Sequence, residues 1–437
     1  MDTLNIPEPS FKPRIVVIGG GFAGLNFLSK LDTRHYQAVL LDRRNYHTFA
    51  PLLYQVATAG LEAPDICGPL RKSFRSKTDF HFRMLGVTGI DAEAQTVRTE
   101  AGSVRYDHLV IATGTRANFF GNPNLERHAL PLKTVPDARN LRNHIFQTLE
   151  HADLCDDPDE RRRLMTFIIV GGGPSGVELA GALSELRRHV LQHDYPDTPM
   201  SQLRFILVEG GQQLLEAFSD ESSDDARRNL EEMGIELRFG HLITKYDGHT
   251  ATFKDGTTIE SNTLIWGAGV TGEVIGGLRD DSVQRARYVI DDHLRVQGYP
   301  EVYALGDISY LTSEAWPHGH PGVAQVAIQM GKRLAHNFNR LAAGKQPAPF
   351  HYVDKGSLAI IGRNRAVADL PRNVHFSGVP AWFVWAFVHI FYLIGFRNRL
   401  FTFLSWVGNY VTYNRSVRLV LEPTLEKELR DRVKKTD

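Results

Sequence analysis

Two glycine triplets with identical spacing are the residues of this sequence from which chemistry is inferred most directly. The first is Gly19-x-Gly21-x-x-Gly24, and the second is Gly171-x-Gly173-x-x-Gly176. Glycines at this spacing allow a tight turn and a close approach of the backbone to phosphate, and the helix that comes next directs its N-terminus at the negative charge. Each triplet therefore predicts a site for the pyrophosphate of a dinucleotide, provided that a strand precedes it and a helix succeeds it.

The first triplet has this context. An apolar run at 15–18 predicts the strand, and the segment FAGLNFLSKL predicts the helix. A second apolar strand ends at Asp42, 23 residues after Gly19, where a carboxylate accepts hydrogen bonds from ribose hydroxyls. We expect the other loop residues to contact the same ligand, namely Gly20, Phe22 and Ala23.

The second triplet comes after a predicted strand at 167–170, and its acidic partner is Glu209, 38 residues after Gly171. This gap exceeds the usual distance of about 20 residues. A lengthened helix and loop at 187–202 account for the excess. No Arg or Lys directly follows Glu209, so a 2′-phosphate would meet negative charge there. NADH is therefore favoured over NADPH.

The two triplets lie 152 residues apart, which does not suggest a repeat array. They predict one dinucleotide that stays bound and one that visits. Three apolar strands that end in glycine complete the pattern: HLVIATGT at 108–115, TLIWGAGV at 263–270 and EVYALGDIS at 301–309. Asp307, at the end of the last strand, is suited to a ribityl chain and a nearby phosphate.

In this order, the motifs GxGxxG, ATG, GxGxxGxE, WGAG and ALGD resemble the two-dinucleotide-binding flavoprotein superfamily over roughly residues 14–345. The resemblance implies an α/β fold with two Rossmann-like domains. We expect an FAD domain at 14–120 and 276–348, interrupted by an NAD domain at 121–275 and succeeded by a C-terminal region at 349–437. The resemblance implies non-covalent FAD contacts, beyond the first triplet, at Asp42, Asn45, Tyr46, Val87, Thr113, Gly114, Asp307, Ala324 and Gln325, and NAD contacts, beyond the second, at Glu209, Gly267 and Gly269.

The number and spacing of the cysteines restrict the possible electron acceptors. The chain has two, Cys67 and Cys155, far apart and without paired spacing. A redox-active dithiol, a disulfide framework and a zinc site are therefore not expected. The several cysteines that sulfide:quinone oxidoreductases need at the flavin are also missing. We expect the flavin to pass electrons directly to an acceptor that approaches it.

Three further segments are similar to type II NADH:quinone oxidoreductases, the single-subunit, non-proton-pumping NADH dehydrogenases. They are NYHTFAPLLYQVATAG at 45–60, AQVAIQMGKRLAHN at 324–337 and the aromatic C-terminal run. The resemblance implies transfer of a hydride from NADH to FAD, and then of two electrons from reduced flavin to a membrane quinone in a respiratory chain. It also implies a quinone pocket with Gln325, and one helical turn on, Gln329. A glutamine donates to a quinone carbonyl without adding charge.

Glu178 is the catalytic candidate beside Gln325. It lies one turn into the helix after the second triplet, where the resemblance places the nicotinamide–flavin contact. Quinone reduction consumes two protons and NADH supplies one hydride, so a carboxylate that relays a proton or positions nicotinamide is useful. The alternative is an acid stabilised by the helix N-terminus, and disulfide reductases also carry glutamate here. His47 is either a cofactor contact or a hydrogen-bonded loop histidine.

The run AWFVWAFVHIFYLIG, at 381–395, is the most apolar segment of the chain. A helix of its length rises about 22 Å, short of the roughly 30 Å of a bilayer core. Helical spacing gives one face of aromatic residues with polar groups, namely Trp382, Trp385, His389, Tyr392 and Phe396, and a purely apolar face with Phe383, Phe387, Phe391 and Ile394. A second run lies at 400–413, with basic residues at 397, 399, 415 and 418. Residues 381–413 are therefore expected to anchor the protein on a membrane surface; a core or dimer-interface helix is the alternative.

Composition limits the remaining possibilities. Fifty basic and fifty acidic residues cancel, so no global charge favours nucleic acid. The first 13 residues show no signal peptide pattern. We expect a peripheral protein on the cytoplasmic face of the cell (inner) membrane, with a homodimer as a further expectation and no metal site. The rival functions are a soluble NADH-dependent flavin reductase for another acceptor and a redox-responsive flavoprotein that acts by binding a partner.

Overall fold

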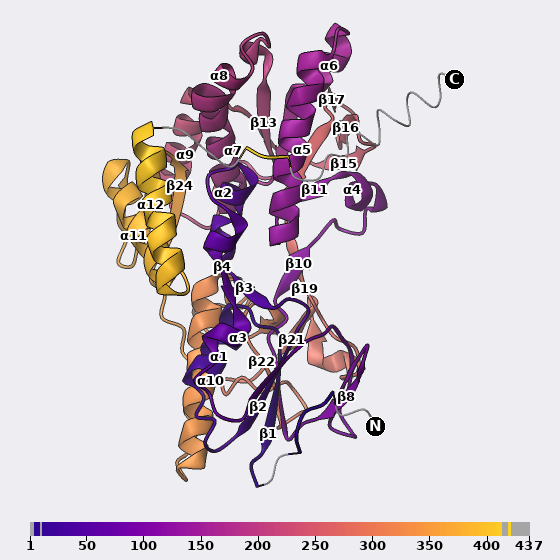
Figure 1. Cartoon of the computed structure of the whole chain (residues 1–437), viewed down its shortest axis with the longest axis vertical. Coiled ribbons are helices and arrows are strands. Elements are labelled where there is room, and N and C mark those ends of the chain that lie inside the picture. Colours follow the sequence, from indigo (N-terminus) through magenta and orange to yellow (C-terminus); the bar gives the residue numbers. More distant parts are fainter. Residues whose placement is uncertain (1–3, 9–10, 413–417, 421–437) are drawn as a thin grey trace. The chain divides into compact units, whose positions relative to one another are not determined.

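The computed structural model describes residues 4–8, 11–412 and 418–420 and divides into two compact units (Figure 1). The first unit contains the chain up to Thr48, Gly68–Arg116 and Val270–Asp354. The second contains Phe49–Cys67, Ala117–Gly269 and the described chain from Lys355 onward. The expected insertion thus groups with residues 49–67 and with the C-terminal region.

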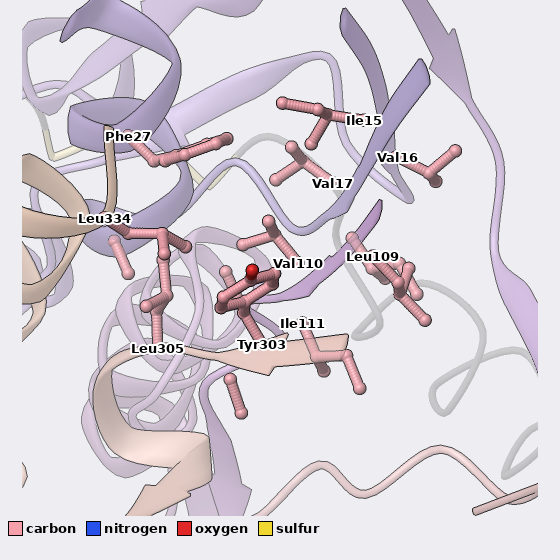
Figure 2. Packing of buried hydrophobic residues seen from close by; sticks show 14 of the residues in the cluster. Ile15, Val16, Val17, Phe27, Leu109, Val110, Ile111, Tyr303, Leu305 and Leu334 are labelled. Atoms are coloured by element: carbon pink, nitrogen blue, oxygen red, sulfur yellow. The ribbon is translucent and has the colours of Figure 1, made fainter. Parts of the chain in front are cut away.

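A five-stranded parallel sheet in the order β22-β9-β1-β2-β5 forms the centre of the first unit. Its strands are β1 (Arg14–Ile18), β2 (Gln37–Asp42), β5 (Phe80–Met84), β9 (His108–Ile111) and β22 (Val302–Ala304). Aliphatic residues fill β1 and β2 because both faces of a parallel sheet are covered. Figure 2 shows Ile15 and Val17 on one side of β1 and Val16 on the other. The predicted strand–turn–helix at the first triplet is confirmed.

Helices α1 (Phe22–Lys30) and α10 (Ala324–Ala342) pack against each other in the first unit (Figure 1). Their close approach requires Gly331, because a Cβ there would collide with the carbonyl oxygen of Ala23 and lie 2.9 Å from the nitrogen of Phe27. The smaller elements here are β3 (Tyr46–Thr48), α3 (Leu70–Ser73), β6 (Val87–Asp91), β7 (Thr96–Thr99), β8 (Gly102–Arg105), β19 (Val270–Gly272), β20 (Val283–Gln284), β21 (Arg287–Val289), η6 (Gly306–Ile308) and β23 (Ser309–Tyr310).

The second unit repeats the parallel architecture with the sheet order β11-β18-β12-β13-β14. Its strands are β11 (Leu130–Pro131), β12 (Thr166–Val170), β13 (Arg204–Glu209), β14 (Glu236–Phe239) and β18 (Thr263–Trp266). Helix α7 (Pro174–Leu186) begins after the second triplet and continues as a π-helix at Arg187–Leu191 and as α8 (Gln192–Asp194), so the predicted lengthened helix is present. Other elements are α2 (Leu53–Ala57), η2 (Ala63–Ile66), α4 (Pro123–His128), α5 (Val135–Leu154), α6 (Pro158–Leu164), α9 (Asp220–Glu232), β15 (Ile243–Tyr246), β16 (Thr250–Phe253) and β17 (Thr258–Glu260).

The C-terminal region packs on the second unit. Antiparallel strands β24 (Ser357–Gly362), β25 (Arg365–Leu370) and β26 (Val374–Ser377) are succeeded by α11 (Val379–Tyr392) and α12 (Phe396–Thr412), which lie side by side (Figure 1). Asp369 of β25 fixes this region to α9, because its carboxylate accepts hydrogen bonds from Ser219 and Ser222 at the start of that helix. Among the described residues, no helix combines the length and apolar character that crossing a bilayer requires. Arg415 and the charged tail lie outside the described residues.

Candidate active site

The physical reasons for glycine differ among the three positions of the first triplet. Gly19 has a φ of +101°, and a Cβ there would collide with the carbonyl oxygen of Ala112. A Cβ on Gly24 would collide with the carbonyl oxygen of Gly19. Gly21, by contrast, has an ordinary φ of −69°, and nothing lies within 4 Å of where its Cβ would be. The fold does not require glycine at position 21, and the lack of a side chain there leaves the start of α1 open.

Asp42 and His47 hold the backbone of this loop. Asp42 Oδ2 accepts a 2.6 Å hydrogen bond from Gly20 N, and Oδ1 accepts one of 2.7 Å from Arg44 N. Burial raises the pKa of Asp42, and these two bonds oppose the rise. Nδ1 of His47 donates to the Gly20 carbonyl oxygen over 3.0 Å, and burial lowers the pKa of His47 to about 4. His47 thus holds the loop backbone as a neutral imidazole, as the hydrogen-bonded alternative predicted. Its predicted role as a cofactor contact stays a prediction.

The remaining expected flavin contacts gather in the first unit. At the turn before Asp307, a Cβ on Gly306 would lie 3.0 Å from the Cβ of Ala327 and 3.4 Å from that of Ala23. The end of β22, the start of α10 and the start of α1 therefore meet there. Residues 324 and 325 form the first turn of α10, Thr113 and Gly114 come after β9, Asn45 and Tyr46 come after β2, and Val87 begins β6.

Gln329 has a structural contact that the sequence did not reveal. Its Nε2 donates to the Val353 carbonyl oxygen over 2.8 Å, and its Oε1 accepts from Val353 N over 3.0 Å. Both ends of the amide are thus used to hold the strand-like segment after α10. This contact supplies a reason for glutamine at 329 that does not involve a quinone.

The second triplet repeats the geometry of the first within its own unit. Gly171 has a φ of +109°, and its Cβ would lie 2.9 Å from the carbonyl carbon of Gly267. A Cβ on Gly176 would collide with the carbonyl oxygen of Gly171, whereas that of Gly173 would meet nothing within 4 Å. The carboxylate of Glu209 accepts from Gly172 N over 2.5 Å and from Gly211 N over 2.6 Å. Again the middle glycine leaves room that no protein atom uses.

Glu178 lies on α7, two residues after the second triplet, and only 7% of its surface is exposed. Burial raises the pKa of Glu178 to about 8, because transfer from water disfavours the carboxylate form. The backbone amide of Ile360 and the nearby indole of Trp385 favour the charge in part, although the indole nitrogen does not reach regular hydrogen-bond geometry within the described residues. Glu178 is therefore largely a neutral carboxylic acid at neutral pH.

This acid borders a pocket of about 120 Å³ within the second unit. The pocket is bordered by α2, by α7 and its π-helical extension, by β24 and by the two C-terminal helices. Its lining residues are Tyr54, Gln55, Thr58, Gly60, Glu178, Ala182, Glu185, His189, Val190, Ile360, Ile361, Gly362, Arg363, Trp382, Trp385, Trp406, Asn409 and Tyr410. Most of these residues were not predicted.

The aromatic face of α11 points into the protein rather than outward. Trp385 is 1% exposed; its ring stacks on His389 with centroids 4.2 Å apart and lies 5.2 Å from Trp406 of α12. Phe383 and Phe387 are 61% and 70% exposed. The predicted spacing holds within α11, where Trp382 and Trp385 line the pocket and His389 stacks on Trp385, although these residues were expected at a membrane surface. The prediction was wrong for Phe396, which begins α12 and is 80% exposed.

Helix α12 closes the pocket by binding the segment that contains α2. Trp406 Nε1 donates to Gln55 Oε1 over 2.7 Å, and Asn409 Nδ2 donates to the Gly60 carbonyl oxygen over 3.0 Å. Nearer the start of α12, Asn398 Nδ2 donates to the Cys67 carbonyl oxygen over 2.7 Å. Residues 398, 402, 406 and 409 repeat every three or four positions, and this polar stripe among aromatic residues was the available signal.

Comparison with known proteins decides the family. Residues 13–331 match the pyridine nucleotide-disulphide oxidoreductase family, and residues 355–413 match the NDH2 C-terminal domain. The type II NADH:quinone oxidoreductase Ndh of Mycobacterium tuberculosis is 36% identical over 427 residues, which cover 93% of this chain and 90% of that protein. The chain belongs to the type II NADH:quinone oxidoreductase family. NdhA of the same organism is 35% identical over 425 residues, which cover 92% of this chain and 89% of that protein.

Solved structures agree with the fold. NDH2 of Plasmodium falciparum, in a complex with NADH, superposes with a TM-score of 0.85 at 22% identity and covers 94% of this chain and 100% of that one. The sulfide:quinone oxidoreductase of Aquifex aeolicus gives 0.70 at 19% identity, covering 89% and 92%. The predicted family, Rossmann-like fold class and oxidoreductase function, from NADH to a quinone, are thereby confirmed, in a flavin-dependent pyridine nucleotide family.

Proposed function

We propose that this enzyme binds FAD in its first unit and NADH in its second, and that it reduces a lipid quinone at a membrane surface without pumping protons. The observation that carries the proposal is the pair of unused openings at Gly21 and Gly173, each beside a helix N-terminus and each bordered by an acid-anchored loop. When bound, FAD would supply the redox chemistry, namely acceptance of a hydride from NADH and transfer of two electrons to the quinone.

The residues present fit FAD. The start of α1 would bind the pyrophosphate through backbone N–H groups, which the absence of a side chain on Gly21 leaves accessible. Asp42 would accept from ribose hydroxyls with lone pairs that its two backbone bonds leave available. Asp307, at the meeting point of β22, α1 and α10, is proposed for the ribityl chain. The other proposed contacts are the flavin-site residues named from the sequence, with Gln325 as the uncharged donor toward the quinone.

The second loop favours NADH. Glu209 already binds the backbone of Gly172 and Gly211, so its carboxylate is fixed at the end of β13. A 2′-phosphate at this carboxylate would be repelled, and the next loop, residues 210–213, contains no cation. The ribose hydroxyls of NADH would instead donate to it. Gly267 and Gly269 end β18 and complete the proposed site.

Glu178 is proposed as the proton donor in quinone reduction. A neutral acid with a pKa of about 8 holds its proton at neutral pH and can still release it when negative charge develops nearby. Its pocket is apolar over most of its lining, which suits a quinone ring. We do not include Gln329 among the quinone contacts, because the backbone of Val353 uses its amide.

The outer face of α11 and α12 is proposed to lie on the bilayer. Its exposed side chains are Val379, Phe383, Phe387, Phe391, Phe396, Leu400, Phe401, Phe403, Leu404 and Val407. The exposed guanidinium of Arg397, 4.7 Å from the ring centroid of Phe401, is available to anionic headgroups. The pocket lies on the opposite face of the same two helices. We propose that a lipid-soluble acceptor passes from the bilayer past these helices into the pocket. We place the enzyme on the cytoplasmic face of the cell membrane. The second candidate for the role of this apolar face is the interface of a homodimer.

The test uses purified full-length protein. We expect it to retain FAD, to bind vesicles of phosphatidylglycerol and phosphatidylcholine, and to oxidise NADH with a short-chain quinone. Glu178→Gln should lower the quinone rate by about 10²-fold, the scale of proton-transfer catalysis, and lower the ferricyanide rate much less. Rapid flavin reduction by NADH that quinone fails to reverse would contradict the proposal.

A further inference from the structure

Glu178 shares its face of the helix with two other titratable residues. Positions 178, 182, 185 and 189 are separated by four, three and four residues, which aligns them along one side of a helix. All four line the same pocket. Ala182, between the two glutamates, has the smallest side chain of the four. The helix thus presents two carboxyl groups and an imidazole, in a row along one side, to the same pocket.

The π-helix at Arg187–Leu191 matters to this row. A π-turn adds a residue to the helical repeat, and such turns recur at functional sites. Here it carries His189, a half-buried residue that lines the pocket and is also partly exposed to solvent. Glu185 is held in place at the middle of the row, because its Oε1 accepts a hydrogen bond from the backbone N–H of Arg363.

The reaction requires a proton from solvent in every turnover. NADH gives up a hydride, which carries two electrons and one hydrogen, whereas quinol formation takes up two electrons and two hydrogens. The balance is NADH + H⁺ + quinone giving NAD⁺ + quinol. If Glu178 donates the second hydrogen, it must be reprotonated. Only 7% of its surface is exposed and it borders the pocket, so we take the pocket as the path of the proton.

We propose that Glu185 and His189, with water in the pocket, form the route by which solvent protons return to Glu178. The proposal rests on the proposed role of Glu178 as donor. His189 takes up a proton at the solvent side, Glu185 passes it inward, and the pocket of about 120 Å³ has room for the water molecules that bridge them. No electrons move in this step; one O–H or N–H bond breaks as the next forms.

Among the described residues that line this pocket, three others carry charged or titratable groups. They are Tyr54 from α2, Arg363 from the turn between β24 and β25, and Tyr410 from α12. The guanidinium of Arg363 lies 3.8 Å from the ring centroid of Tyr410. Of the titratable groups that line the pocket, Glu185 and His189 are the two that lie on the same continuous helix as Glu178.

Hydrogen–deuterium exchange of the Glu178 carboxyl group tests the route directly. The C=O stretching band of protonated Glu178 is the infrared band that disappears in Glu178→Gln. In full-length protein transferred to D2O, we expect this band to shift at least about tenfold more slowly in Glu185→Gln and in His189→Phe. Glu185→Gln keeps the acceptor for Arg363 N–H, so the fold should persist. The matched control is His193→Ala, an exposed histidine four residues further on that does not line the pocket.

Kinetics give a second readout. Ferricyanide takes electrons without protons, so the ratio of quinone to ferricyanide turnover should fall in His189→Ala, most at alkaline pH, and added imidazole should restore it. An exchange rate that is unchanged in both variants would overturn the route, even if the wild-type protein reduces quinone and the proposed function holds. Slowed exchange in a protein that does not reduce quinone would uphold the route and reject the proposed function.

Discussion

The two glycine loops are built to the same plan, but the helices after them differ. In each loop, the outer glycines are required by backbone contacts, the middle glycine opens onto free space, and an acid at the end of the second strand binds the loop backbone. Two residues after the last glycine, however, α1 has Asn26 and α7 has Glu178. Asn26 Nδ2 donates to the Phe22 carbonyl oxygen of its own helix. Glu178 instead faces a pocket as a buried acid.

This difference separates holding a ligand from reacting with one. The first loop is enclosed by further side chains: His47 binds Gly20 and meets the ring of Phe22 edge-on at 4.9 Å. The second is braced by Leu215 N, which donates to the Gly172 carbonyl oxygen over 2.8 Å, and its helix continues into the pocket. An enclosed loop suits a resident cofactor, and a loop leading to a reactive acid suits a substrate.

The largest expected effect is at the middle glycine of the first loop. Gly21→Val places a branched side chain in the space proposed for the pyrophosphate of FAD. We expect the protein to fold but to lose its flavin on gel filtration, and with it more than about 10³-fold of its activity, which is roughly 4 kcal/mol. Flavin absorbance and circular dichroism measure this. The control is Gly276→Val, an exposed glycine of the same unit whose Cβ would also meet nothing within 4 Å.

The same change in the second loop should be smaller and different in kind. Gly173→Val should leave the flavin bound and lower kcat/KM for NADH by roughly 10–100-fold, since a visiting substrate loses affinity while the resident cofactor does not. Steady-state kinetics with NADH varied measure it. Loss of flavin from this variant, or its retention in Gly21→Val, would reverse the assignment of the two loops.

A third change sharpens the comparison of the acids. Glu209→Gln removes the charge proposed to repel a 2′-phosphate but keeps an acceptor for Gly172 N. The ratio of kcat/KM for NADPH to that for NADH should rise by about tenfold, equivalent to about 1.4 kcal/mol. Asp42→Asn, in the other loop, should leave this ratio as it is. Equal shifts in both variants would mean that Glu209 does not discriminate.

The last expected effect is on stability rather than on activity. The pKa of Glu178 is about 8 in the folded protein and 4.5 ordinarily, so the folded state holds this proton more tightly. The stability that this provides is complete below about pH 4.5 and is lost by up to ~1.4 kcal/mol per pH unit as the pH rises toward 8. Glu178→Gln should therefore raise Tm relative to wild type increasingly from pH 5 to pH 8. The comparison variant is Asn26→Asp, which creates an acid at the matching position of α1. Its Tm should not rise above that of the wild type at alkaline pH.

The loops were predictable from sequence because their elements are local. A strand, a turn and a helix within 20 residues specify each other through apolar runs and glycine spacing, and the structure has them at the predicted residues. The pocket was not predictable in this way. It joins residues 54–60, 178–190, 360–363 and 382–410, whose proximity depends on long-range packing.

The direction of α11 shows why the C-terminal prediction was incomplete. Trp385 and His389 have an apolar body and a polar group, which suits a membrane interface but suits a protein interior equally when a partner is present. Here His389 Nδ1 donates to the Trp385 carbonyl oxygen of its own helix over 2.7 Å, and the indole of Trp385 lies near Glu178. Periodicity identified the two faces, and only the tertiary fold distinguished inside from outside.

Gly181 has a consequence for the order of folding. A Cβ on Gly181 would collide with the carbonyl oxygen of Ile361, so α7 lies directly against β24. Helix α12, near the other end of the chain, is hydrogen-bonded to residues 55–67. Contacts between such distant segments form late, because their loops are long. During synthesis, the helix that bears Glu178 should remain accessible to proteases until the last fifth of the protein leaves the ribosome. The enzyme would thus complete its reactive pocket in the same step that creates its membrane-facing helices.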